Sequence, residues 1–446
     1  MRAFSRTDRE KLSHEGPLGV RIGDRFSQMS GASILDDLQA RGLIHDTTDA
    51  DALRERLDAG PITLYHGIDP SASSLHIGNY VGVLALRRFQ DAGHNIIVLV
   101  GGATGMVGDP GGRSEERNLL DEETLASNIA GIRSQLERLV DLDPGGATAE
   151  MVSNYDWTKD MGVLDFLRDV GKHVTVNQMV ARDSVKSRMQ SEHGISYTEF
   201  SYMLLQAMDF HHLHVAKGCD LQIGGSDQWG NIAQGVDLIR RREGAHAHGL
   251  TWPLITRADG QKFGKSVSGA VWLDPERTSP YEFHQYWKNT DDRDVERFLL
   301  QLTLLPVAEI GAIMDEHTKA PQERRAQQAL ADAVTELIHG AEMVTSANTA
   351  AKVMFSNEAP TADDLAALRG VVPETEIAIG DLGDEPVVEL LLASGLASSK
   401  RDARQSLKDG AVRWNGEKVD GELALEAGVV AMLQKGKRNK HLVVLR

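Results

Sequence analysis

The chain of 446 residues contains one cysteine, Cys219, few aromatic residues (5%) and no long apolar run. One cysteine cannot form an intramolecular disulfide framework, and it cannot build a structural zinc site on several thiolates. No run approaches the roughly 18 apolar residues of a membrane helix, so we expect no membrane partner. The opening MRAFSRTDREKLSHEGP lacks the apolar core of a secretory signal. These absences predict a cytoplasmic protein in a reducing compartment.

Basic residues are outnumbered by acidic ones, 48 Lys and Arg against 65 Asp and Glu, so the formal net charge is −17. An acidic chain argues at first against a nucleic-acid partner, which usually requires a basic surface. The distribution along the chain changes this interpretation. Residues 386–446 contain eleven Lys or Arg and seven Asp or Glu, a net charge of +4, whereas residues 1–385 carry −21. The sequence therefore predicts a small basic module attached to a large acidic body.

The hydrophobic content of 41% and charged content of 25% are those of a globular protein with two or three domains. Apolar spacing predicts a helix capped by Ser33 and a second that opens at a capping box over 48–51. ITLYHG, HIGNYVGVLALRRFQDAGH and NIIVLVGG then form a strand–helix–strand unit. Further strands at AEMVSN, CDLQIGG and LTWPLIT alternate with helices near 161–170, 198–210 and 228–242. This alternation predicts a doubly wound, Rossmann-like parallel sheet.

Composition shifts divide the chain into segments. Residues 280–356 show helical patterns with few strand signals, and residues 357–385 are rich in Pro, Gly, Asp and Glu, which is typical of a linker. We therefore expect an extension at 1–31, an α/β domain at 32–255, a loop region at 256–279, a helical domain at 280–356, a linker at 357–385 and the basic module at 386–446.

Two segments carry residues suited to phosphate. In PSASSLHIGNY a polar turn leads into a helix start near His76, where free N–H groups attract anions and Gly78 lets a ligand approach. In RADGQKFGKSVSG, Lys262 and Lys265 can together meet the charge of a triphosphate. A helix cap and a solvated surface loop are the simpler interpretations. A Walker loop is excluded because Asp259 stands where that motif has glycine.

Three further segments predict polar groups near the carboxyl edge of the sheet, where ligands bind in open α/β folds. GGATGMVGDPGGRSEER forms an ordered loop that carries Asp109, or a purely structural turn. In FSYMLLQAMDF, Tyr202, Gln206 and Asp209 share one helical face. If buried, they pair with one another or with a ligand that carries an amine and a hydroxyl. In LQIGGSDQWGN, Asp227 caps a helix or holds a ribose hydroxyl.

Together and in this order, these segments resemble bacterial tyrosyl-tRNA synthetases, which are class I aminoacyl-tRNA synthetases. The resemblance runs from about Ser33 to the carboxyl terminus. It includes a HIGH-type signature at 76–79 and a KMSKS-type signature at 262–266, with YHGIDPSAS, VGGATGMVGDP, SYMLLQAMDF and LQIGGSDQWGN. The tail VVELLLASGLASSKRDARQSLKDGAVRWNGEKV resembles the S-four-type RNA-binding module, a helical hairpin followed by a Gly-turned strand pair. The resemblance thus implies a catalytic domain, an anticodon-side helical domain and a small α+β RNA-binding domain.

The resemblance implies a role for each matching residue. Tyr65 and Asp209 would hold the phenolic hydroxyl of tyrosine. The ammonium group of tyrosine would be held by Asp109, Tyr202 and Gln206, and Gln228 would lie by its carboxylate. The nucleotide would meet Gly67, Asp69, His76, Gly78, Asp227, Lys262 and Lys265. The catalytic residues would be His76, Asn79, Lys262, Lys265 and Ser266. The tRNA would contact Lys400, Arg401 and Arg404.

The implied activity is that of a tyrosine–tRNA ligase. The tyrosine carboxylate attacks the α-phosphorus of ATP and releases pyrophosphate, and a terminal ribose hydroxyl of the tRNA then takes the tyrosyl group. The carboxylate is already a nucleophile, so positioning and charge stabilisation carry the first step. Mg²⁺ would accompany ATP without a protein cage or other tightly bound cofactor, and the family implies a homodimer. Asn79 replaces a second histidine, and Met208 replaces an aromatic residue, so we expect an effect on rate rather than on the reaction.

Three alternatives stay open on the sequence alone. A tryptophanyl-type synthetase is disfavoured because Tyr65 and Asp209 suit a phenol. A catalytically idle RNA-binding relative is disfavoured by the intact His76, Lys262 and Lys265. An adenylating ligase that never meets tRNA is disfavoured by the basic tail.

Overall fold

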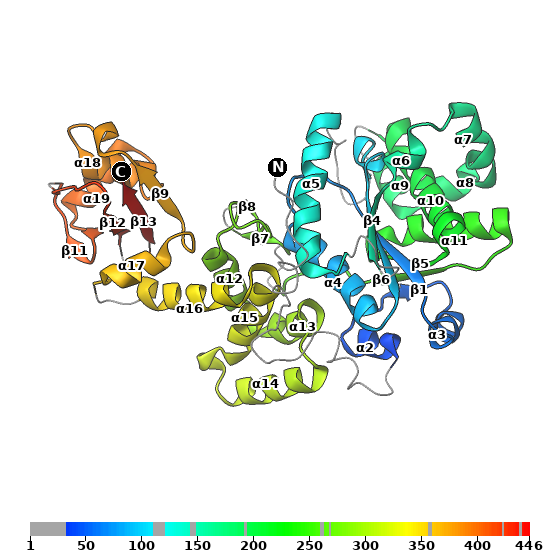
Figure 1. The fold of residues 1–446 in the computed structure, drawn as a ribbon, viewed down its shortest axis with the longest axis horizontal. Helices are drawn as coiled ribbons and strands as arrows, with labels where there is room; N and C mark the ends of the chain where they lie inside the picture. Colours follow the sequence, from blue (N-terminus) through cyan, green and yellow to red (C-terminus); the bar gives the residue numbers. More distant parts are fainter. Residues whose placement is uncertain are drawn as a thin grey trace, which may run out of the picture. The chain divides into compact units, whose positions relative to one another are not determined.

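The computed structural model describes residues 33–109, 121–142, 149–190, 194–258, 263–266, 269–355, 359–421, 423–436 and 439–446. The expected extension at 1–31 lies outside these residues. The chain divides into two compact units (Figure 1). The first unit comprises Met1–Ser73 and Asn79–Ile255, and the second comprises Ser74–Gly78 and Thr256–Arg446.

The first unit is built on a six-stranded sheet with the strand order β1-β6-β5-β2-β3-β4. The strands are β1 (Asp46–Thr47), β2 (Thr63–Ile68), β3 (Asn95–Val100), β4 (Ala149–Ser153), β5 (Cys219–Gly225) and β6 (His248–Trp252). Only the pairing of β1 with β6 is antiparallel; the other neighbouring strands are parallel. The predicted doubly wound sheet is confirmed. From β2 the chain goes outward to β3 on one side and later to β5 on the other, so ligands are expected at the carboxyl ends of β2 and β5.

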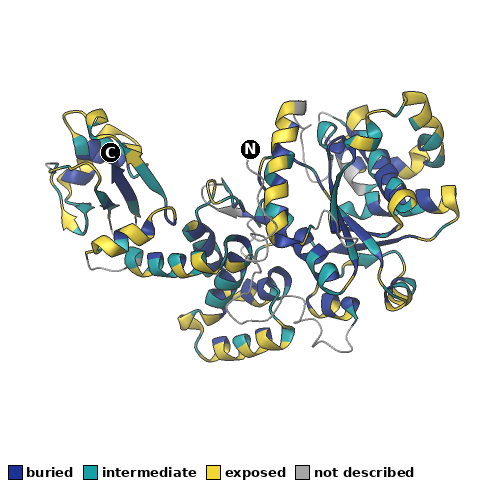
Figure 2. Cartoon of the chain, in the orientation of Figure 1, coloured by how far each residue is buried: buried dark blue, intermediate teal, exposed yellow. Residues whose placement is uncertain are grey.

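Helices cover both faces of this sheet (Figure 1). The helices α4 (Ile77–Asp91) and α5 (Glu122–Leu139) lie on one side, and α10 (Tyr197–Lys217) and α11 (Trp229–Glu243) lie on the other. The shorter elements are α2 (Ile34–Ala40), α3 (Ala50–Asp58), α6 (Tyr155–Thr158), α7 (Val163–Asp169), α8 (Val176–Val180) and α9 (Asp183–Met189), with the 3₁₀ turns η1 (Thr104–Met106), η2 (Gly171–His173) and η3 (Ser226–Gln228). Figure 2 shows the strands mostly buried and the outer helix faces exposed.

Local signals set the helix ends, with one correction. Ser33 caps α2, as the sequence predicts, and the structure shows that it does so through a capping box. The second cap is Asp49 rather than Thr48, because the Asp49 side chain accepts a hydrogen bond from the Ala52 N–H at 3.0 Å. The Thr48 hydroxyl instead accepts from the Gly249 N–H at 3.1 Å, beside the pairing of β1 with β6. Both residue types cap helices, and the strand contact takes Thr48 away from that role.

The second unit begins with a two-stranded sheet and a set of packed helices. The strands are β7 (Lys265–Ser266) and β8 (Gly269–Ala270). The helices are α12 (Pro280–Lys288), α13 (Asp292–Leu302), α14 (Val307–Lys319), α15 (Arg325–His339) and α16 (Ala341–Phe355), with the 3₁₀ turn η4 (Pro321–Glu323). Fully buried aromatic side chains such as Phe283 and Trp287 form its core. The predicted helical region is confirmed.

The carboxyl-terminal part of the second unit has its own five-stranded sheet, in the order β11-β10-β12-β13-β9. Its helices are α17 (Ala362–Leu368), α18 (Pro386–Ala393) and α19 (Lys400–Lys408), and its strands are β9 (Glu374–Ile377), β10 (Val412–Trp414), β11 (Glu417–Lys418), β12 (Val430–Lys435) and β13 (Asn439–Leu445), with the 3₁₀ turn η5 (Ile379–Asp381). Asn415 and Gly416 join β10 to β11 with φ of 47° and 88°. The helical hairpin and the turned strand pair have the form that the tail sequence predicts.

The stretch expected as a linker, 357–385, differs in the structure. Its described residues contain α17 and β9, and β9 pairs in parallel with β13. Leu365 and Leu368 of α17 are buried in a cluster with Met432 and Leu442 of the sheet. The sequence did not predict β9, because the alternating Glu and Thr in ETEI carry no local apolar signal. The strand forms only by pairing with the distant strand β13. Within the described residues, no helix has the length and apolarity needed to cross a membrane.

Candidate active site

Tyr65 lies in the middle of the first unit's sheet. It is placed in register with Ile97 of β3 and Gln222 of β5, and it is 1% exposed. Its hydroxyl is buried and has no hydrogen-bond partner among the described residues. Burial, with the nearby charge of Asp209, raises the pKa of this phenol well above its usual value. Tyr65 therefore has a protonated hydroxyl that is available to hydrogen-bond a polar ligand group.

Asp209 on α10 is the acidic neighbour of that hydroxyl. It is 2% exposed, and its two oxygens accept hydrogen bonds from Asn154 Nδ2 and Trp157 Nε1, each at 2.9 Å. Burial raises the pKa of Asp209 to about 7, and these two hydrogen bonds act in the opposite direction. Each carboxylate oxygen can accept a further hydrogen bond. A buried phenol and a buried carboxyl group thus offer both partners that a ligand hydroxyl needs.

Asn154 and Trp157 are site residues that the sequence reasoning missed. Asn154 is fully buried directly after β4, and its side-chain oxygen accepts from the Ala103 N–H at 2.7 Å. Trp157 follows on α6, and its ring stacks on His212 at 4.3 Å. One signal was available, because Asn154 stands at the carboxyl end of a predicted parallel strand. No motif marks NYDW, however, so the spacing alone did not identify them.

Asp69 forms a second polar cluster just past the end of β2. Its Oδ2 accepts from the Tyr202 hydroxyl and its Oδ1 from the Thr104 hydroxyl, each at 3.0 Å. Thr104 also accepts from Asn154 Nδ2 at 3.0 Å. Residues from β2, η1, α10 and the end of β4 are thereby joined in one network. Gly67 is exposed within the central strand β2, so a ligand can approach the backbone there.

A third cluster gathers around Gln228 at the end of β5. Its Nε2 donates to Asp109 Oδ2 at 2.7 Å and to Asp227 Oδ2 at 3.3 Å. Asn231 Nδ2 donates to the side-chain oxygens of Gln206 and Gln228, at 3.0 and 3.2 Å. Two carboxylates and three side-chain amide groups therefore converge at one place. Such an acceptor-rich cluster suits a ligand with an ammonium group.

Parts of the two signature segments, residues 76–78 and 263–266, meet within the second unit. The Ile77 N–H donates to the Val271 carbonyl at 3.1 Å, and a Cβ on Gly264 would lie 3.4 Å from Ile77 Cγ1. Gly264 itself has φ of 84°. His76 Nδ1 accepts from the Gly78 N–H at 3.1 Å, and a Cβ on Gly78 would lie 2.8 Å from the His76 ring. Glycine at position 78 thus leaves the space that the His76 ring occupies.

The remaining signature residues are described only in part. Asn79 lies half-buried in the first turn of α4. Lys265 and Ser266 form strand β7 with their backbones. Lys262 lies outside the described residues.

The expected tRNA-binding residues lie on α19. Lys400 Nζ contacts Glu389 at 2.5 Å, and Arg404 contacts Glu385 at 2.6 Å. Arg401 is exposed between them. Ion pairs at an exposed surface are weak, so a phosphate group can replace either carboxylate. The surface is therefore available to a polyanion but is less positive than the sequence suggests.

Comparison with known proteins identifies the family. Residues 57–356 match the class I tRNA synthetases (W and Y), and residues 364–443 match the tyrosine–tRNA ligase SYY-like C-terminal domain. The tyrosine–tRNA ligase of Bacillus caldotenax is 49% identical over 420 residues, which cover 92% of this chain and 99% of that protein. The tyrosine–tRNA ligase of Opitutus terrae is 50% identical over 423 residues, which cover 92% of this chain and 99% of that protein.

A solved structure gives the same result. The C-terminally truncated mitochondrial tyrosyl-tRNA synthetase of Aspergillus nidulans has a TM-score of 0.66 and 32% identity, and the match covers 75% of this chain and 97% of that one. The fold, both family regions and the level of identity agree. The chain belongs to the tyrosine–tRNA ligases of the class I tRNA synthetases.

Proposed function

We propose that the chain activates L-tyrosine with ATP to form tyrosyl-adenylate and pyrophosphate, and then transfers tyrosine to the 3′-terminal ribose of its tRNA. The observation that supports this most strongly is the buried Tyr65 hydroxyl, which lacks a hydrogen-bond partner among the described residues and lies near the buried carboxyl group of Asp209. A phenolic hydroxyl can donate to Asp209 and accept from Tyr65. Phenylalanine would leave the Tyr65 hydroxyl unpaired and would give Asp209 no donor from the ligand. Selection on the order of 10⁵, a figure that comes from this enzyme family itself, follows from such a mismatch.

The backbone groups of the amino acid have candidate partners in the cluster around Gln228. Asp109 and Gln206 of this cluster, together with Tyr202 from the cluster around Asp69, receive the ammonium group, because their side-chain oxygens accept hydrogen bonds. Gln228 lies by the carboxylate, where its amide nitrogen can donate. A carboxylate held in this way attacks the α-phosphorus without a general base.

The nucleotide is assigned to residues at the carboxyl strand ends and at the start of α4. Gly67 leaves room for backbone approach, and Gly78 leaves room for the His76 ring. Asp69 and Asp227 accept from the ribose and amine groups, and His76 and Asn79 donate to phosphate. Lys262, Lys265 and Ser266 stabilise the charge that develops on the departing pyrophosphate. ATP arrives as its Mg²⁺ complex, and the metal belongs to the substrate.

Transfer to tRNA uses the carboxyl-terminal module. Lys400, Arg401 and Arg404 lie along exposed α19, and a polyanion can displace the carboxylates that pair with two of them. Reading of the tRNA by this module also sets the ligase apart from an enzyme that only forms adenylates.

We also infer that the protein acts as a homodimer in the cytoplasm. Large apolar side chains are exposed on neighbouring short helices of the first unit, where Val163 is 74% and Leu164 80% exposed on α7 and Val176 is 62% exposed on α8. Figure 2 shows α7 as mostly exposed. An apolar surface of this kind is typical of a contact with a second copy. Sedimentation of the full chain tests it, because a Leu164→Glu variant should shift a dimer to a monomer.

The activity is tested by ATP–pyrophosphate exchange with tyrosine, phenylalanine and tryptophan offered separately. Exchange that depends on tyrosine alone supports the proposed assignment. Exchange with tryptophan would indicate a tryptophanyl-type synthetase instead. No exchange with any of the three amino acids would leave only an RNA-binding role.

A further inference from the structure

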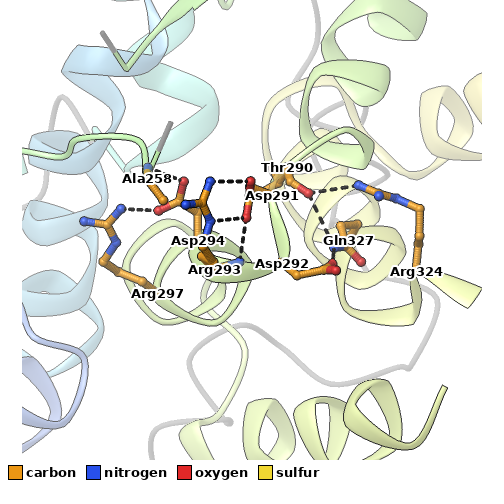
Figure 3. Close-up of polar contacts among 9 residues, drawn as sticks. All are labelled: Ala258, Thr290, Asp291, Asp292, Arg293, Asp294, Arg297, Arg324 and Gln327. Atoms are coloured by element: carbon orange, nitrogen blue, oxygen red, sulfur yellow. Dashed lines mark hydrogen bonds and ion pairs between the residues drawn. The ribbon is translucent and has the colours of Figure 1, made fainter. Parts of the chain in front are cut away.

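Helix α13 holds the chain just before the KMSKS-type segment. Asp294 Oδ2 accepts a hydrogen bond from the Ala258 N–H at 2.8 Å, and Arg297 donates to the Thr256 carbonyl at 2.5 Å. The same Arg297 nitrogen contacts Asp294 Oδ1 at 2.5 Å (Figure 3). One side-chain pair therefore binds backbone groups two residues apart, which fixes both the position and the direction of the chain there.

The same helix holds the chain again on the other side of Lys262. The Phe263 ring packs against Phe298 of α13 with centroids 5.4 Å apart, and against Trp287 of α12 at 6.1 Å. Gly264 follows and donates its N–H to the Tyr286 hydroxyl at 3.4 Å. Phe298 lies four residues after Asp294, on the same helix face. Lys262 is thus flanked on both sides by residues that contact one face of α13.

The start of α13 is itself held by α15. Gln327 Nε2 donates to Asp292 Oδ1 at 2.5 Å, and Arg324 donates to the Thr290 carbonyl at 2.9 Å (Figure 3). Arg324 also donates to the Lys288 carbonyl at 3.0 Å. These bonds tie the turn between α12 and α13 to the helical core, so α13 gives a firm base for residues 256–258.

Burial of the Asp294 carboxylate costs more free energy than a purely structural contact would require. Asp294 is 2% exposed, and a buried carboxylate requires partners for its charge. Arg297 supplies the opposite charge and Ala258 supplies a backbone donor, so the pair works as one unit. A backbone contact between neutral groups would join the two segments without such a cost. The charged pair is therefore expected where the position of the backbone matters.

We propose that Asp294 and Arg297 are positioning residues for the activation step, which act by fixing the backbone that leads to Lys262. The inference rests on the proposed role of Lys262 and Lys265 at the pyrophosphate. A displacement of about 1 Å at a charge-stabilising group can lower a rate by about 10²-fold. Loss of the pair should therefore slow activation without changing how tyrosine is bound.

The test compares purified full-length variants in ATP–pyrophosphate exchange, with kcat and KM measured for tyrosine and ATP. Asp294→Asn removes the buried charge, Arg297→Met removes its partner, and Arg297→Lys keeps the positive charge on a shorter side chain. Glu296→Gln is the matched control, because it removes one negative charge from the same helix at an exposed position. Lys265→Ala reports separately on the proposed role of the lysines. Thermal melting of every variant measures folding.

Asp294→Asn and Arg297→Met are expected to lower kcat by about ten- to a hundredfold. KM for tyrosine should stay close to that of Glu296→Gln, and Arg297→Lys should recover most of the rate. The melting temperature of Arg297→Met should fall, because Asp294 then stays buried without its charged partner. The inference is overturned if both variants keep the control's kcat while Lys265→Ala loses activity. It is also overturned if kcat, tyrosine KM and melting temperature deteriorate together, which would indicate only a structural contact. An unchanged rate in Lys265→Ala would reject the proposed lysine role and the inference with it.

Discussion

The indole Nε1–H of Trp157 donates a hydrogen bond to Oδ1 of Asp209 at 2.9 Å. A residue outside every signature motif thus holds the carboxyl group that we assign to the phenol of tyrosine. Asn154 holds the other oxygen of Asp209 at 2.9 Å. The orientation of the specificity group therefore depends on side chains just after β4 and on α6 as much as on α10.

Replacing Trp157 by phenylalanine should weaken the use of tyrosine without weakening the binding of ATP. The change keeps an aromatic ring to stack on His212 but removes the donor to Asp209. A hydrogen bond to a charged group contributes about 1.5–3 kcal/mol. We expect kcat/KM for tyrosine to fall by about ten- to a hundredfold, with KM for ATP nearly unchanged. Equal losses for both substrates in the exchange assay would contradict this role.

Asp209 should make stability depend on pH. Burial raises its pKa to about 7 in the folded chain, whereas an unfolded aspartate titrates near about 4. Between these values the folded state retains a proton that the unfolded state has lost, so the contribution of Asp209 to stability falls as the pH rises. Urea unfolding at several pH values measures this.

The variant Asp209→Asn removes the titration. The free energy of unfolding of the variant minus that of the wild type should increase by about 1 kcal/mol per pH unit from pH 5 to 7. This difference should become constant above pH 8. Glu296→Gln, at an exposed site, should show no such trend. A difference between wild type and Asp209→Asn that is constant with pH would show that the carboxyl group titrates normally.

Gly78→Ala should separate activity from stability. The added Cβ would lie 2.8 Å from the His76 ring, which must then move. Alanine in the first turn of α4 favours the helix by up to about 1 kcal/mol. We expect a loss of about tenfold in exchange kcat with an unchanged or raised melting temperature.

The control for this change is Gly311→Ala in α14, where a Cβ meets no atom within 4 Å. It should raise the melting temperature and leave exchange unchanged. Full activity of Gly78→Ala would remove the support for a role of the His76 ring.

Arg401→Ala should affect tRNA charging alone. Arg401 is exposed on α19, and loss of one phosphate contact should weaken tRNA binding and reduce the slope of log affinity against log salt by about one. Exchange without tRNA should be unaffected. Lys319→Ala on α14 is the control for an exposed cation elsewhere. A salt slope that matches this control would place the tRNA contacts on another surface.

The sequence predicted the parts of the fold that have local signals. Strands β2 and β3 were predicted because TLYHGI and NIIVLV are short, largely apolar runs, and the shared face of Tyr202, Gln206 and Asp209 followed from the helical period. The residues that orient Asp209 were not visible, because their contacts join segments more than 50 positions apart. The same holds for β9, whose pairing with β13 alone makes it a strand.

The central claim is that Tyr65 and Asp209 read the hydroxyl of tyrosine. The most direct test is the ratio of kcat/KM for tyrosine over phenylalanine in exchange, for the wild type and for Tyr65→Phe. We predict that the variant lowers this ratio by at least about tenfold, mainly through a lower kcat/KM for tyrosine. The variant lacks the hydroxyl that hydrogen-bonds the phenolic hydroxyl of the substrate. An unchanged ratio, with a similar loss for both amino acids, would show that Tyr65 only packs the core.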